Sequence, residues 1–151
     1  MEILKYKINH KLVVDTRFDA RIKGFDGVEC ALDDGLAQLR NNILSAMPGF
    51  MYDGGSGPTV DTYDTYRGTL IHDILYRLMR NDKIPYKKYR KAADIAMRIQ
   101  LTKDAKIRYK HSCILVTIIS RLRPYVWYWA VRWFGESSAS PVDNGIAKCM
   151  N

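Results

Sequence analysis

This sequence has only three cysteines among 151 residues, too few to suggest a protein built around disulfide bonds or zinc ions. Cys30, Cys113 and Cys149 have no paired spacing, so we expect neither a disulfide framework nor a zinc site, and a reducing compartment is the simpler inference. The N-terminus lacks the apolar core of a signal peptide, so no secretory signal is expected. The longest apolar run, residues 113–119, is too short to span a bilayer.

Acidic residues are scarce in the second half of the chain. Residues 1–75 hold 8 Lys/Arg and 11 Asp/Glu, whereas residues 76–151 hold 16 and 5, and the net charge is +8. The basic half is interpreted either as a solvated helical surface or as a contact for acidic or phosphate-bearing partners. Basic residues alternate with tyrosines over residues 86–91, but no recognised nucleic-acid motif accompanies them, so nucleic acid is not the expected partner.

Hydrophobic periodicity predicts a single α+β domain. Period-two patterns and β-branched residues predict strands over residues 2–8, 11–18 and 28–32, while residues 36–47 fit a helix or a strand. Helical spacing predicts helices over 67–80, over 86–101, from about 102 through 119, and over 125–134, with Pro124 kinking or restarting the chain. We expect a small N-terminal antiparallel sheet packed on three to four helices in residues 1–135, followed by a loosely ordered tail, 136–151.

A histidine and an acid are predicted to meet across the first helical hairpin. His72 and Tyr76 share one helix face at i and i+4. The short connection at 81–85 predicts antiparallel helices, in which residues equidistant from the turn lie level, and this places Asp94 beside His72. A carboxylate there would fix the imidazole tautomer and leave the other nitrogen as a general base. A shift of half a turn would instead point Asp94 away.

A glycine-rich turn precedes the first helix and suggests a cation site. Calcium takes several oxygen ligands, often backbone carbonyls together with a carboxylate. An Asp in a loop more often caps a turn or a helix, so that interpretation stays open. The candidate metal ligands are Asp73, Asp53, Gly55 and Gly57, with Asp61 and Asp64 as further acids.

Ser56, in the same turn, is a candidate nucleophile. It could complete a Ser–His–Asp set with His72 and Asp94, because such triads are defined by geometry rather than by order. The G-x-S-x-G pattern of a nucleophile elbow fails, since Pro58 occupies the place of the last glycine. A serine in a glycine-rich turn more often bonds its own backbone.

The last predicted helix is rich in aromatic residues. We expect residues 125–134 to pack into the core, because the other helices need a partner and aromatic side chains bury large areas. The alternative is that this helix lies on a membrane surface, with Arg121, Arg123 and Arg132 near lipid headgroups.

Four motifs together resemble a bacteriophage-encoded family of domains of unknown function (family thirteen-fifty-three). Residues 48–58 resemble its P-x-G-F-x-x-D-x-x-S-x-P signature, residues 72–77 its H-D-x-L-Y-R, residues 90–94 its R-x-x-A-D, and residues 128–135 its closing helix. Met97 stands where that family usually has an aromatic residue. The resemblance implies a phage or prophage origin, often near virion or lysis genes, and assigns no reaction.

The order of glycine-rich turn, acid, H-D-x-x-Y helix and later Asp is also similar to secreted phospholipases A2. That similarity implies that His72 activates water, that Asp73 binds calcium with loop carbonyls, and that Asp94 and Tyr76 orient the site. Two features depart from that family: the disulfide cysteines are absent, and Asp64 stands eight residues before His72, a longer gap.

Three functional hypotheses follow. The first is a phage-encoded hydrolase with a His72–Asp94 dyad, calcium-assisted and directed at lipid or cell envelope, in the virion or the host cytoplasm. The second is a non-catalytic virion or assembly component of head or tail, in which the polar cluster locks the loop onto the helix pair. The third is a basic adaptor that binds phage or host envelope partners through its second helix.

Overall fold

Strands and helices occupy separate halves of the chain in the computed structural model, which describes residues 4–8, 11–54 and 62–141. The strands are β1 Leu4–Ile8, β2 Lys11–Val14, β3 Phe18–Arg21, β4 Cys30–Ala31, β5 Ala37–Arg40, β6 Ile43–Ala46 and β7 Met51–Tyr52. One antiparallel sheet has the order β1-β2-β7 and a second has the order β3-β6-β5-β4. The helices are α1 Tyr66–Arg80, α2 Tyr86–Arg108, α3 Ile114–Phe134 and α4 Glu136–Ala139. The predicted α+β class is confirmed.

The segment that the sequence left ambiguous, residues 36–47, forms the hairpin of β5 and β6. Arg40 pairs with Ile43 at its end, and the two residues between them, Asn41 and Asn42, have φ angles of 50° and 60°. Two-residue hairpin turns require such left-handed backbone, which asparagine tolerates better than most residues. The Asn-Asn pair therefore decides in favour of strands.

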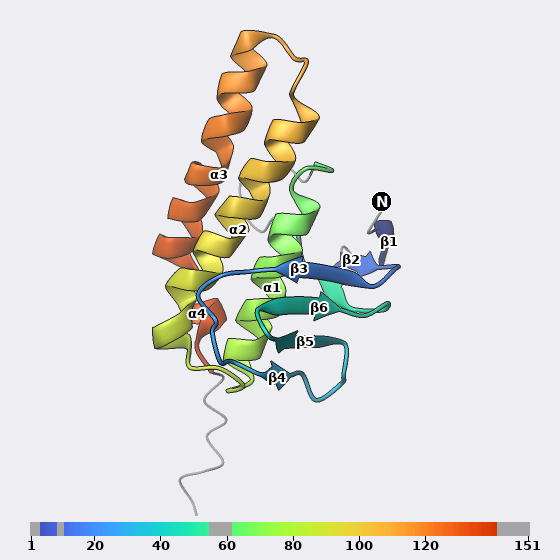
Figure 1. Cartoon of the computed structure of the whole chain (residues 1–151), viewed down its shortest axis with the longest axis vertical. Helices are drawn as coiled ribbons and strands as arrows, with labels where there is room; N and C mark the ends of the chain where they lie inside the picture. The colour runs from blue at the N-terminus through green and yellow to red at the C-terminus, as the bar shows by residue number, and fades with distance from the viewer. Residues whose placement is uncertain (1–3, 9–10, 55–61, 142–151) are drawn as a thin grey trace, which may run out of the picture.

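The hydrophobic core lies between the strands and α1. Figure 1 shows α1 against the strands, with α2 and then α3 on its other side. Phe25, Leu44 and Phe50 from the strand half are fully buried together with Leu70 and Ile74 of α1. This packing holds α1 rigidly, so the polar side chains on its other face have fixed positions.

The helical boundaries differ from the prediction after the first hairpin. The connection ends at Pro85 as expected, but α2 continues to Arg108 because no helix-breaking residue follows Leu101. A predicted helix start near residue 102 is therefore wrong. Of the two predicted effects of Pro124, a kink or a restart, the restart is not observed, since α3 runs through this buried proline as one helix.

Ordered structure continues beyond the predicted domain boundary at residue 135. Helix α4 follows directly and buries Ala139, and Arg80 of α1 donates a hydrogen bond of 3.1 Å to the Ser138 carbonyl. Helix α4, residues 136–139, thus packs on α1, where the sequence predicted the beginning of a loose tail. Residues 142–151 of that predicted tail lie outside the described residues.

Candidate functional site

His72 and Asp94 meet across the α1–α2 hairpin as predicted. His72 Nε2 lies 3.3 Å from Asp94 Oδ1, and Asp94 is completely buried while 12% of the His72 side chain is exposed. Antiparallel packing of two helices joined by a short turn brings the two residues level. The predicted adjacency is confirmed, and the imidazole lies on the solvent side of the carboxylate.

Asp94 is held in place by two further donors. The Tyr76 hydroxyl donates a hydrogen bond of 2.8 Å to Oδ1, and Arg132 Nη1 donates one of 3.0 Å to Oδ2. Burial opposes the charged form of Asp94, but His72, Tyr76 and Arg132 outweigh it, so the pKa of Asp94 lies below its ordinary value of 3.8. Asp94 is therefore a buried carboxylate that stays ionised.

His72 lies between two carboxylates. Its Nδ1 is 3.5 Å from Asp73 Oδ1, opposite the Asp94 contact at Nε2. Burial disfavours the charged ring, but the two acids outweigh that effect and raise the pKa of His72 above 6.5. Nε2 is buried and its contact with Asp94 does not meet hydrogen-bond geometry. Such an unsatisfied polar atom costs about 1–3 kcal/mol and therefore needs an explanation, of which a catalytic role is one.

Arg90 ties the site to the end of α3. It donates to the carbonyl oxygens of Val131 and Arg132 at 3.0 and 2.7 Å, pairs with Glu136 at 3.1 Å, and contacts the Tyr76 hydroxyl at 3.4 Å. The carbonyls at a helix C-terminus carry partial negative charge, and Arg90 adds a second donor to the Val131 carbonyl, which also accepts from the Gly135 N–H at 2.9 Å. The sequence prediction gave Arg90 and Arg132 no role at Asp94, although Arg90 stands at i−4 from Asp94 and so shares its helix face.

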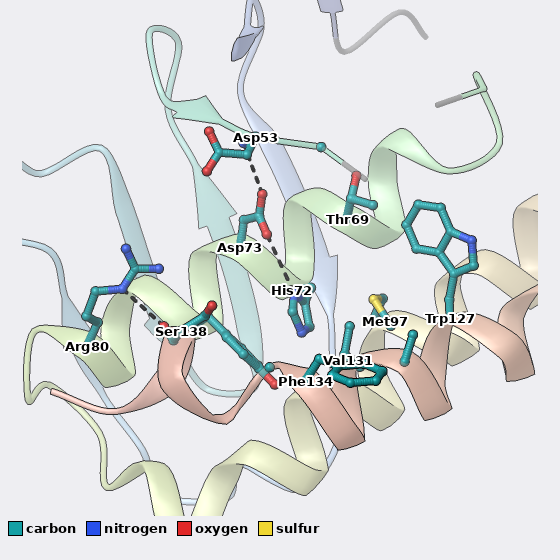
Figure 2. Close-up of a pocket in the computed structure, with 14 residues that line it drawn as sticks. Asp53, Thr69, His72, Asp73, Arg80, Met97, Trp127, Val131, Phe134 and Ser138 are labelled. Atoms are coloured by element: carbon teal, nitrogen blue, oxygen red, sulfur yellow. Dashed lines mark hydrogen bonds and ion pairs between the residues drawn. The ribbon is translucent and has the colours of Figure 1, made fainter. Parts of the chain in front are cut away.

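A cavity of about 450 Å³ opens next to His72. His72, Asp73 and Tyr76 line it from α1, and Asp94 does not reach it, so the imidazole stands between the cavity and the buried acid. In Figure 2 the His72 ring projects from α1 toward α3, and Asp73 lies between Asp53 and His72. The apolar part of the lining is Met97, Trp127, Ala130, Val131 and Phe134. The cavity thus combines one histidine–acid pair with an apolar wall.

The predicted calcium ligands differ in their contacts and in their exposure to solvent. Asp73 Oδ2 accepts a hydrogen bond of 3.2 Å from the Asp53 backbone N–H, whereas the Asp53 carboxylate is exposed and lies 3.6 Å from Lys11 Nζ. Asp64 is buried elsewhere, with Arg123 and Arg108. Gly55, Ser56, Gly57 and Asp61 lie outside the described residues.

Within residues 4–8, 11–54 and 62–141, no group of three or more His, Cys, Asp or Glu side chains is placed to hold a metal ion. Calcium prefers about six to eight oxygen ligands. Asp73 and Asp53 do not supply such a set by themselves, so the described residues do not make a calcium site alone.

The aromatic helix does not pack into the core as predicted. Trp127 is buried against Met97 and Leu101, but Trp129, Trp133 and Phe134 are 51%, 71% and 80% exposed. The prediction was wrong because α1 already packs against the strands, and α3 can bury only the side that faces α2. No helix in the described part of the chain is long and apolar enough to cross a membrane.

Comparisons with protein-family models, with curated proteins and with solved structures found no match to this chain.

Proposed function

We propose that this chain is a bacteriophage hydrolase in which His72 acts as the general base. The observation that carries the proposal is the position of His72 between a cavity and a buried, ionised Asp94. On this proposal the reacting form of His72 is the neutral imidazole, with its proton on Nε2 toward Asp94, and Nδ1, the nitrogen 3.5 Å from Asp73, takes up the proton of water. Tyr76 and Arg132 keep the Asp94 carboxylate oriented toward the ring.

The proposed reaction is hydrolysis of an ester in a lipid or cell-envelope substrate. His72 takes a proton from water while the water oxygen attacks the carbonyl carbon, and the imidazolium then returns the proton to the leaving alkoxide. The apolar wall formed by Trp127, Val131 and Phe134 suits an acyl chain better than a polar substrate. Phage origin and a place in the virion or host cytoplasm are supported by the motif resemblance alone and belong to the proposal.

Asp73 would be one ligand of a calcium ion in this proposal, together with the predicted carbonyls of Gly55 and Gly57, which lie outside the described residues. When bound, the ion would supply positive charge next to the reacting carbonyl. The assignment to Asp73 is supported by the position of this residue at the cavity.

The deciding experiment measures hydrolysis of phospholipid vesicles and of purified cell-wall material by the full chain and by His72→Asn. We expect the variant to keep its circular dichroism spectrum and to lose at least about a hundredfold in rate, the usual contribution of a general base. His111→Asn is the matched control, because His111 is an exposed histidine outside the site. Equal rates for His72→Asn and the wild-type chain would contradict the proposal.

The competing proposal is a non-catalytic virion or assembly component. It is favoured by the network in which Asp94, Arg90 and Arg132 tie α2 to the end of α3. On this proposal His72→Asn lowers the melting temperature, no hydrolysis is found with any substrate, and mass spectrometry finds the chain in purified virions. Hydrolysis by the wild-type chain that is lost in His72→Asn would exclude it.

A further inference from the structure

Helix α3 carries a continuous exposed apolar face. Six large side chains recur at intervals of four, three, four, three and four residues, and each is at least half exposed, from 51% for Trp129 to 71% for Trp133. We call this set the α3 face; its members are Leu115, Ile119, Leu122, Val126, Trp129 and Trp133. Such spacing aligns side chains along one side of a helix.

The α3 face has no partner among the described residues. Helix α3 contacts α2 and α4, and its buried side chains, Ser120, Pro124 and Trp127, lie on another side of the helix. Figure 1 shows α3 at the outer side of the helical layer, beyond α2 from the strands. Six side chains exposed to this degree present on the order of 700 Å², more than the roughly 300–600 Å² of the largest patch on a typical monomer. An exposed apolar patch of this size indicates an interaction surface.

The charge around the α3 face favours one of two partners for it, a membrane surface rather than a second copy of the chain. From residue 105 to residue 135 the chain has six Lys/Arg and no acidic residue. Arg123 and Arg132 turn toward Asp64 and Asp94, whereas Arg121 and Lys110 are exposed. A second copy of the chain would bring the same basic surroundings against itself, and Glu136, the acid that directly follows α3, already pairs with Arg90. Anionic lipid headgroups supply the complementary charge.

We propose that the α3 face docks on a membrane surface that contains anionic lipid. An amphipathic helix with tryptophans on its apolar side and basic residues beside it lies in the plane of the headgroups and buries its apolar side chains by several ångströms. Trp129 and Trp133 suit this depth, since their rings are apolar and each carries one polar N–H.

The α3 face lies next to the cavity at the C-terminal end of the helix. Phe134 is 80% exposed at the end of α3 and also lines the cavity next to His72. A membrane on the α3 face therefore lies beside the entrance to the candidate site. Docking itself does not depend on catalysis, but the further step, that lipid from this surface is the substrate, rests on the proposed function.

Co-sedimentation of the full chain with vesicles tests the inference. We expect binding to phosphatidylglycerol vesicles, binding at least about tenfold weaker to phosphatidylcholine vesicles, and release from the former by high salt. Val126→Glu places a charge in the middle of the α3 face and should weaken binding by at least about tenfold. Ile107→Glu is the matched control, because Ile107 is an exposed apolar residue of α2 outside the face, at 74%.

Three results would overturn the inference. The first is a wild-type chain that stays in the supernatant with both kinds of vesicle. The second is an Ile107→Glu variant that loses as much binding as Val126→Glu. The third is light scattering that shows a dimer which Val126→Glu dissociates, since the α3 face would then join two copies. His72→Asn separates this inference from the proposed function: it should bind vesicles like the wild-type chain while hydrolysis is lost.

Discussion

Tyr76 of α1 donates a hydrogen bond of 2.8 Å to the carboxylate of Asp94 on α2, and the two side chains are almost completely buried. The acid is thus oriented from the same helix that carries His72, one turn further along. Because the Tyr76 and His72 rings also lie against each other, with centroids 3.9 Å apart, the three side chains form one packed unit.

Removing only the Tyr76 hydroxyl tests that unit. Tyr76→Phe keeps the ring and leaves Asp94 Oδ1 without its donor, so we expect a loss of about 1–2 kcal/mol in the free energy of unfolding. Urea denaturation measures this loss. Tyr63→Phe is the control, since Tyr63 is 72% exposed and should change stability by less than about 0.5 kcal/mol. Equal stability of the two variants would mean that the hydrogen bond contributes nothing.

The ionisation of His72 should make stability depend on pH. The pKa of His72 is raised in the folded chain, since the Asp73 and Asp94 carboxylates outweigh burial. Its contribution is therefore complete below pH 6.5 and is lost as pH rises through the raised pKa. Denaturation at a series of pH values should show unfolding free energy declining over that range in the wild-type chain, and a flatter profile in His72→Asn. An unchanged slope in the variant would contradict the assignment.

Asp94 should act in the opposite direction at low pH. Burial favours its neutral form, but His72, Tyr76 and Arg132 lower the pKa of Asp94 below 3.8. The stability that the ionised carboxylate contributes is complete above pH 3.8 and is lost as pH falls through the lowered pKa. We expect Asp94→Asn to shift the midpoint of acid unfolding to a higher pH than in the wild-type chain, because the variant lacks the charge that pairs with Arg132. Acid titration followed by circular dichroism measures the shift.

Calcium should stabilise the folded chain if Asp73 is its ligand. At one hundred times the dissociation constant, a ligand of the native state adds about 2.7 kcal/mol, which appears as a rise in melting temperature. We expect this rise in the wild-type chain and its loss in Asp73→Asn. Asp82→Asn is the control, because Asp82 is an exposed acid of the helix connection. If Asp73→Asn responds to calcium as the wild-type chain does, the metal assignment is wrong.

We expect any side chain at position 68 to lower the stability of the folded chain. A Cβ at this position of α1 would lie 2.6 Å from Leu101 side-chain atoms and 3.3 Å from the Met97 carbonyl oxygen of α2. We expect Gly68→Ala to cost about 1–3 kcal/mol through overpacking, as measured by thermal unfolding. Leu101→Val in the same chain should restore part of the loss, since it shortens the opposing side chain. If Gly68→Ala alone is as stable as the wild-type chain, the Leu101 side chain moves aside without cost and the overpacking argument is wrong.

The sequence predicted the centre of the site because local rules govern it. His72 and Tyr76 are one helical turn apart, and Asp94 follows from counting residues on both sides of a short turn. The α+β class follows from periods of two and 3.6 in different halves of the chain. The chemical roles of His72, Asp94, Tyr76 and Asp73 remain predictions.

Contacts between distant segments could not be predicted in this way. Arg132 reaches Asp94 across 38 positions, and nothing in the spacing of α3 indicates which of its sides meets α2. The aromatic residues of α3 fit a buried or an exposed helix equally well, since the periodicity of a helix does not reveal its partner. Because α1 packs against the strands and α2 packs against α1, α3 is the outermost helix and most of its aromatic residues are exposed.

Gly135 has a consequence for how this chain can diverge. A Cβ there would lie 3.0 Å from the Tyr76 hydroxyl oxygen and 2.6 Å from the Val131 carbonyl oxygen. A smaller residue at position 76 would remove only the contact with the tyrosine, whereas the closer contact with the backbone of α3 would remain. Any side chain at position 135 would therefore press both on the end of α3 and on the phenol next to Asp94, 59 positions away in the chain, and we expect glycine at this position in homologues.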